Sequence, residues 1–297
     1  MDMKALAMGV AFALMWSSAF TSARIIVVDA PPLTALAVRF LISGVLAVAV
    51  ARALGQSWAL SPAQWRATAL FGLCQNALYL GLYFVAMQTV EASLAAIVAS
   101  TLPLLVALSG WAVRGERIRP LGAAGLVAGM GGVALIMGTR IGGGAVDPIG
   151  LGLCVAGVLA LTVATLSMRT ASSGGNLLMI VGLQMLVGAT ALAAVGLATE
   201  PLEVRWTWTL AAAFVYTTLV PGLAATFVWF LLVERVGAVR AATFHFLNPF
   251  LGVAIAALVL GERIGALDAL GVAVIAAGIL AVQLSKTAGP RPAASAP

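Results

Sequence analysis

The sequence predicts an all-α membrane protein whose ten transmembrane helices form two inverted five-helix repeats. Composition, an internal repeat and the distribution of charge carry this prediction. Of the 297 residues, 62% are hydrophobic and only 9% are charged. Polar side chains are too few to cover the surface of a soluble globule, so the chain is an integral membrane protein.

Ten apolar runs follow one another along the chain, separated by charges, prolines and glycine clusters. A span of the bilayer needs about 20 mainly apolar residues, and each run is close to that length. The runs lie at residues 4–28, 33–53, 65–87, 92–113, 120–138, 148–169, 176–198, 208–233, 238–260 and 266–284. A cleaved signal peptide is the alternative for the first run, but that run continues to Val28 and is longer than a usual signal-peptide core.

The fourth and fifth runs return as the ninth and tenth. The segment Val90–Gly132 matches Val236–Gly278 without a gap, and both copies contain Gly-Glu-Arg-Ile. The matched pairs include Pro103 with Pro249, Ala95 with Ala241, Gly125 with Gly271 and Gly132 with Gly278. Internal duplication in a membrane chain is typical of transporters built from two related halves. We expect one repeat at 1–140, the other at 141–287, and a disordered tail at 288–297 that is rich in Pro and Ala.

Because each repeat has an odd number of spans, the second must enter the membrane upside down relative to the first. Placing the N-terminus in the cytoplasm gives a positive-inside distribution of basic residues. The inner segments then carry Lys4, Arg52, Arg66, Arg114, Arg117, Arg119, Arg169, Arg235, Arg240, Lys286 and Arg291, and the outer ones Arg24, Arg140, Arg205 and Arg263. This pattern predicts a multi-pass protein of the cytoplasmic (inner) membrane with both termini in the cytoplasm, and the scarcity of Lys beside Arg favours a bacterial source.

Several of these features together resemble one known superfamily. They are the inverted five-span halves, a Gly-Glu-Arg motif after the fourth span of each half, a proline in the fourth and ninth spans, and Trp16 in the first. On these motifs, residues 4–284 resemble the drug/metabolite transporter superfamily, in particular its EamA-type branch and the bacterial YddG-type amino-acid exporters. The resemblance implies a basket of helices in two bundles, a central cavity that opens alternately to each side, and export of amino acids or other metabolites.

Three polar side chains of the third span, Asn76, Tyr79 and Tyr83, fall at i, i+3 and i+7 on one face of an α-helix. We predict that they line the cavity, and hydrogen bonding between packed helices is the alternative. In the repeat register Tyr83 corresponds to Trp229, which suggests one gate near each side of the membrane. Aromatic belts at the two membrane interfaces are the alternative for this pair.

The first, fourth and ninth spans carry the other candidate substrate-binding residues. Trp16 stands in the middle of the first span and is the aromatic residue that we expect to contact substrate, with core packing as the alternative. Ser100 is a weaker candidate, since Ser often bonds its own helix. His245 and Asn248 form the densest polar spot of any predicted span. An ionisable group inside a membrane is a functional hypothesis by default, and hydrogen-bonded packing is the alternative.

Prolines and arginines inside the spans add further candidates. Pro103, Pro221 and Pro249 each remove a backbone donor and are candidate hinges or gates, with a static kink as the alternative. Arg24 and Arg39 are the cations expected within the membrane. They can pair, snorkel to the interface or contact a substrate carboxylate.

The residue inventory favours a secondary-type exporter that works by alternating access. No Asp or Glu lies at the centre of a predicted span, which disfavours tight coupling of transport to a cation. Transport is therefore expected to be facilitative. His245 is the only candidate for a weak link to protons. Aromatic rings and neutral amides suit a neutral amphipathic metabolite, such as an amino acid with an apolar or aromatic side chain. An organic cation or drug is the alternative substrate.

Other functions lack the residues that they need. A membrane-embedded lipid-modifying enzyme requires a catalytic constellation, but the chain has a single His and no carboxylate pair within a span. An ion channel requires a charged ring or a filter-like segment. Cys74 and Cys154 stand alone, which leaves no disulfide framework or CxxC site. We expect no catalytic residue, metal, cofactor or nucleic-acid partner, and a monomer or weak homo-oligomer whose partners are its small-molecule substrate and the lipid bilayer.

Overall fold

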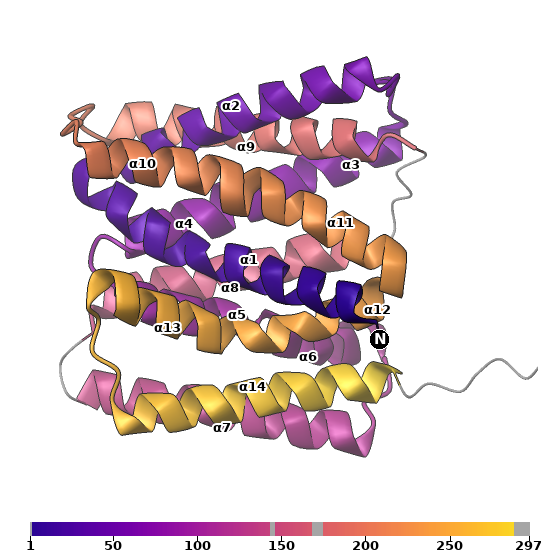
Figure 1. The fold of residues 1–297 in the computed structure, drawn as a ribbon, viewed down its shortest axis with the longest axis vertical. Helices are drawn as coiled ribbons and strands as arrows, with labels where there is room; N and C mark the ends of the chain where they lie inside the picture. Colours follow the sequence, from indigo (N-terminus) through magenta and orange to yellow (C-terminus); the bar gives the residue numbers. More distant parts are fainter. Residues whose placement is uncertain (1, 143–145, 168–174, 288–297) are drawn as a thin grey trace, which may run out of the picture.

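The computed structural model describes residues 2–142, 146–167 and 175–287, and every regular element in these ranges is a helix. The helices lie side by side and roughly along one common direction (Figure 1). Their bounds are α1 (Met3–Asp29), α2 (Pro32–Ala53), α3 (Pro62–Phe71), η1 (Gly72–Tyr79), α4 (Leu80–Ala86), α5 (Ala92–Ser100), α6 (Leu102–Arg114), α7 (Pro120–Gly142), α8 (Pro148–Ser167), α9 (Leu177–Thr199), α10 (Trp208–Thr217), η3 (Thr218–Ala224), α11 (Ala225–Val236), α12 (Ala238–Ala242), η4 (Thr243–Leu247), α13 (Asn248–Leu260) and α14 (Ala266–Thr287).

Ten helical units in the described ranges are long and apolar enough to cross a membrane, which confirms the ten predicted spans. Most predicted ends agree with the helices within about three residues, the uncertainty expected of such boundaries. The predicted boundary between the repeats falls in the last turn of α7, which continues to Gly142. The predicted tail at 288–297 lies outside the described residues.

The second repeat is inverted, because spans that correspond in the two repeats run antiparallel. The fifth and tenth spans, α7 and α14, form one such pair at one edge of the bundle (Figure 1). A Cβ added to Gly278 of α14 would lie 2.5 Å from the carbonyl oxygen of Gly125 in α7, whereas one added to Gly132 would lie 2.9 Å from that of Gly271. The backbones therefore meet directly along an antiparallel seam of small residues. The second and seventh spans, α2 and α9, pair in the same way.

The fourth and ninth spans are each interrupted just before their proline. The fourth span divides into α5 and α6 at Thr101, and the ninth divides into α12 and α13 around the 3₁₀ turn η4. Pro103 and Pro249 then stand in the first turn of the following helix. A proline is tolerated there because its missing N–H has no partner within the helix at that position. From the sequence we expected these prolines in the middle of continuous spans. In the structure each lies in the first turn of the second of two half-helices.

The third and eighth spans contain π-helical segments, which the sequence did not predict. η1 occupies Gly72–Tyr79 and η3 occupies Thr218–Ala224, so the two segments match in the repeat register. Pro221 lies inside η3, and Gln75 takes the corresponding place in η1. A π-helical turn changes the spacing at which side chains share a face, so the i, i+3, i+7 rule of an α-helix does not apply across η1.

Polar contacts tie the two repeats together at one end of the bundle. We call the end where α1 begins the N-terminal face and the other end the opposite face. On the opposite face Asp29 pairs with Arg205 at 2.7 Å, and Glu200 accepts hydrogen bonds from the first turn of α2. On the same face Glu262 accepts from the first two N–H groups of α5, at 2.8 and 2.9 Å. A carboxylate at a helix N-terminus satisfies unpaired donors and complements the helix dipole.

Candidate functional site

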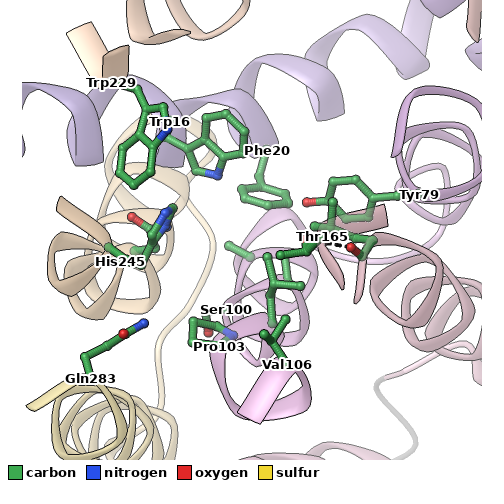
Figure 2. Close-up of a pocket in the computed structure, with 16 residues that line it drawn as sticks. Trp16, Phe20, Tyr79, Ser100, Pro103, Val106, Thr165, Trp229, His245 and Gln283 are labelled. Atoms are coloured by element: carbon green, nitrogen blue, oxygen red, sulfur yellow. Dashed lines mark hydrogen bonds between the residues drawn. The ribbon is translucent and has the colours of Figure 1, made fainter. Parts of the chain in front are cut away.

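The centre of the bundle encloses a cavity of about 590 Å³. Figure 2 shows its labelled side chains arranged around an open space, with His245 and Gln283 on one side and Tyr79 and Thr165 on the other. The lining residues are Trp16, Phe20, Tyr79, Ala96, Ala99, Ser100, Leu102, Pro103, Val106, Leu161, Thr165, Trp229, Ala242, His245, Asn248 and Gln283. The volume falls within the range of roughly 300–1,000 Å³ that is usual for small-molecule sites.

This large cavity lies toward the N-terminal face. Ala242 ends α12, Thr165 lies two residues before the end of α8, and Gln283 is in the last turns of α14, all at that face. Toward the opposite face the bundle is packed instead: the side chains of Tyr83, Phe84 and Met87 are at most 2% exposed. The cavity therefore approaches one face and is closed off from the other.

One wall of the large cavity is an aromatic cluster built by three separate elements. Trp229 of α11 lies 5.3 Å from the imidazole of His245 in η4, measured between ring centroids. Phe12 of α1 packs behind both, at 4.8 Å from Trp229 and 5.4 Å from His245, and also lies 5.7 Å from Trp16. His245 joins this cluster from the 3₁₀ turn that interrupts the ninth span.

A hydrogen-bond chain orients the polar side chains of the same wall. Ser17 donates to the side-chain oxygen of Asn248 at 3.5 Å and to its backbone oxygen at 3.4 Å. This leaves the amide nitrogen of Asn248 facing His245 Nδ1 at 2.9 Å. An amide nitrogen can only donate, so Nδ1 accepts and the neutral imidazole carries its proton on Nε2. The wall thus offers a neutral imidazole and an oriented amide.

An aromatic layer closes the end of the large cavity that points to the opposite face. Tyr79 lies 4.7 Å from Tyr83 between ring centroids, and Phe20 lies 6.0 Å from Tyr83. Behind Phe20 and Tyr79 is a small cavity of about 60 Å³, which shares Trp16, Phe20 and Tyr79 with the large one. The small cavity also reaches Arg39, Gln75, Tyr83 and Pro221.

Most of the residues singled out in the sequence meet in these two cavities. The large cavity contains Trp16, Tyr79, Ser100, Pro103, Trp229, His245 and Asn248, and the small one adds Tyr83 and Pro221. Ser100 reaches the wall with its hydroxyl donated to Ile97 of its own helix at 2.7 Å. Tyr83 is 1% exposed and Trp229 packs against Phe12 inside the bundle. Neither residue has the exposed position expected of an aromatic belt at the membrane interface. Pro249 is buried and lines neither cavity.

Asn76, which the sequence predicted to line the cavity, lines neither of the two cavities. It is buried and donates to the carbonyl oxygen of Gln184 in α9 at 2.9 Å, outside both cavities. The cause is η1, in which the wider π turn rotates Asn76 away from the face that carries Tyr79 and Tyr83. Interhelical hydrogen bonding, the alternative considered from the sequence, fits this residue.

Sequence reasoning missed Gln283, Gln75 and Phe12. Gln283 is an isolated amide within the apolar tenth span, and a polar side chain in such a span indicates a candidate site residue. Phe12 could not be found in this way, since one Phe among the apolar residues of α1 has no distinguishing pattern. In the described part of the chain, no three His, Cys, Asp or Glu side chains gather as metal ligands would. None of the residues lining either cavity is Asp or Glu.

Comparison with known proteins agrees with this architecture. The sequence model of the EamA-like transporter family matches residues 3–138 and 148–284. The uncharacterized transporter YvbV of Bacillus subtilis is 25% identical over 250 residues, covering 84% of this chain and 81% of that protein. Protein PecM of Dickeya dadantii is 25% identical over 273 residues, covering 89% and 86%. A protein of known crystal structure, 23% identical, superposes with a TM-score of 0.68 over 96% of this chain and 98% of its own, and so shares the fold.

Proposed function

We propose that this chain, which belongs to the EamA-like transporter family, moves small amphipathic metabolites across the bacterial cytoplasmic membrane through its large cavity. The preferred substrates are amino acids, including those with aromatic and other apolar side chains. The observation that carries the proposal is the composition of the cavity wall. Aromatic rings, one neutral imidazole and two amides surround about 590 Å³, and no carboxylate side chain lines it.

This wall matches the two halves of an amphipathic solute. Trp16, Phe20 and Trp229 offer apolar faces, whereas His245 and Asn248 offer polar groups whose orientation is fixed by hydrogen bonds. A few fixed polar groups within a mainly apolar pocket are typical of small-molecule recognition. A polyanion such as a nucleotide sugar would find no cluster of cations among the lining residues.

The inverted repeat supports alternating access as the mechanism. With the N-terminus in the cytoplasm, the large cavity lies on the cytoplasmic side, and the aromatic layer around Tyr83 closes the outer side. An inverted duplication allows the two halves to exchange conformations, which would open the outer side and close the inner one. A solute collected from the cytoplasm would then be released outside. Without a carboxylate in either cavity, movement down the solute gradient is the expected mode.

Counterflow in proteoliposomes tests this proposal. The panel contains labelled leucine, phenylalanine and tryptophan, aromatic amines as organic cations, and nucleotide sugars. We expect exchange of the amino acids, with little exchange of nucleotide sugars. Exchange of the amines alone would replace the amino-acid assignment with the organic-cation one, which the aromatic wall could also accommodate.

Variants of the wall connect this exchange to the cavity. Trp16→Ala and His245→Ala should each reduce exchange at least tenfold while the protein still inserts and elutes as one species. Trp206→Ala is the matched control, because Trp206 is 83% exposed and lines neither of the two cavities. If both cavity variants exchange solute at the wild-type rate, the aromatic wall does not line the transport path.

A further inference from the structure

Helix α2 carries a cation inside the bundle that has no anionic partner. Arg39 is 7% exposed, and its Nε is among the buried polar atoms that have no hydrogen-bond partner. Among the described residues, no carboxylate pairs with Arg39 and no carbonyl accepts a hydrogen bond from it. The guanidinium carbon lies over the ring of Phe40, 5.2 Å from the ring centroid, and this cation–π contact supplies no hydrogen-bond acceptor.

The other intramembrane cation provides a contrast. Arg24 of α1 donates to the carbonyl oxygen of Met87, so it anchors the first span to the end of the third. Arg39 makes no such bond, although an arginine remains charged under all physiological conditions. Burying a charge without a partner is costly, and in membrane proteins such charges mark substrate pathways.

Arg39 belongs to the wall of the small cavity, together with a second unpaired donor. The hydroxyl of Tyr83 is buried and also lacks a hydrogen-bond partner. Gln75 contributes an amide to the same wall. No Asp or Glu lines this cavity, and its titratable residues are Arg39, Tyr79 and Tyr83. These two donors lack hydrogen-bond partners and belong to residues that line the same small cavity. An acceptor bound there would satisfy them, and the positive charge favours an anion as that acceptor.

The fold makes room for this guanidinium on the side of the eighth span. A Cβ added to Gly222 of η3 would lie 3.2 Å from Nη2 of Arg39, so a side chain at this position would press on the guanidinium. The neighbouring Pro221 lines the small cavity. The π-helical segment therefore places a glycine where the charged group must approach the backbone.

We propose that the small cavity is the subsite for a single carboxylate of the transported solute, bound by the guanidinium of Arg39 and the hydroxyl of Tyr83. This inference rests on the proposed function and narrows its substrate class to amino acids and other monocarboxylates. The planar guanidinium matches the two oxygens of a carboxylate. One cation neutralises one negative charge, so a phosphate dianion would leave charge buried and unpaired.

The two cavities together would hold such a solute. They share Trp16, Phe20 and Tyr79, so a ligand that passes between these rings occupies both spaces. Its carboxylate enters the small cavity of about 60 Å³, and its apolar part remains in the large one. The positive charge of Arg39 disfavours organic cations at the same position, although the aromatic wall alone would accept them.

A comparison of phenylalanine with phenylalaninamide tests the subsite in proteoliposomes. The two compounds have the same ring and the same α-amino group, which is kept protonated by working at about pH 6, and they differ in the carboxylate. We expect the wild type to prefer phenylalanine, measured as the ratio of exchange rates at low concentration. Arg39→Met should lower this preference about 10- to 100-fold, the loss expected when a charge-assisted hydrogen bond disappears. Arg24→Met removes the other intramembrane cation and should keep the wild-type preference.

The outcomes separate the subsite from the proposed function. If the wild type exchanges phenylalanine and Arg39→Met keeps the full preference, the carboxylate subsite is wrong and the amino-acid function stands. If the wild type prefers the amide or exchanges neither compound, the proposed substrate class fails and the subsite fails with it. If Arg39→Met does not fold, Tyr83→Phe decides: it retains the ring, and a preference unchanged from the wild type overturns the subsite.

Discussion

Glu262 gives the sharpest prediction about how the bundle stays closed at its opposite face. This residue belongs to the second Gly-Glu-Arg-Ile loop, and its carboxylate accepts hydrogen bonds from the N–H groups of Ala92 and Ser93 in the other repeat. The contact lies on the opposite face, beyond the aromatic layer that closes the large cavity. We predict that Glu262→Gln weakens this closure and increases the population of a state that is open at the opposite face.

The size of the effect follows from the contact. Glutamine retains one acceptor oxygen but loses the charge and the second acceptor at the start of α5. A hydrogen bond to a charged group contributes roughly 1.5–3 kcal/mol, and a charge at a helix N-terminus roughly 0.3–1 kcal/mol. With one such bond kept in weaker form, we expect a shift of about 2 kcal/mol, or about 30-fold in the equilibrium between closed and open states.

Thiol accessibility measures this shift. Ala23 lines the small cavity and is 2% exposed, so Ala23→Cys reports opening from the opposite face. The buried native Cys74 and Cys154 are first replaced by Ala. An impermeant thiol reagent added on the side of the opposite face should react with the introduced Cys about 30 times faster when Glu262→Gln is also present.

The matched control is Glu203→Gln, which alters an exposed carboxylate in the loop before α10 and should leave the reaction rate unchanged. An unchanged rate in Glu262→Gln would refute the closure role of Glu262. A faster rate accompanied by a large fall in melting temperature would also refute it, because general loosening would then explain the access.

Three further predictions concern stability and coupling. Gly278→Ala should destabilise the protein by about 1–3 kcal/mol in thermal melts, because the new Cβ would meet the backbone of α7 at 2.5 Å. Gly131→Ala is the control: a Cβ added there has nothing within 4 Å, so this variant should be neutral or stabilising. An imposed pH gradient should not drive solute accumulation in proteoliposomes, because the Nδ1 of His245 is held as an acceptor; accumulation above equilibrium would contradict this. The hydrogen bond from Arg235 lowers the pKa of Asp2 from 3.8 to about 2, so the stability difference between wild type and Asp2→Asn should be constant above pH 3.8 and disappear as the pH falls through about 2.

The sequence predicted the architecture well because its physical causes are regular. Hydrophobic length alone locates the ten spans, and the register that matches Gly125 with Gly271 and Gly132 with Gly278 predicted two related halves. The same glycines form the seam between α7 and α14, where only small residues allow the backbones to meet. These features depend on composition and period, which are visible without coordinates.

The candidate site was harder to predict because it depends on departures from regular helices. Tyr79 and Tyr83 lie beside the cavities, but the π-helical η1 rotates Asn76 out of their face. No residue type predicts a π turn from the sequence. Arg39 was noticed as an intramembrane cation with three possible roles. Only the packing shows that its Nε has no hydrogen-bond partner and that Tyr83, whose hydroxyl also lacks one, lines the same cavity.

Blocking the large cavity tests the central claim, that solute passes through it. Ala99 lines this cavity, so Ala99→Cys in the Cys74→Ala, Cys154→Ala background places one thiol in the path, and Ala128→Cys on the exposed side of α7 is the control. We predict that a charged thiol reagent abolishes phenylalanine exchange by Ala99→Cys alone and that phenylalanine slows the modification. Unimpaired exchange by the fully modified Ala99→Cys protein would contradict the claim that this cavity is the route.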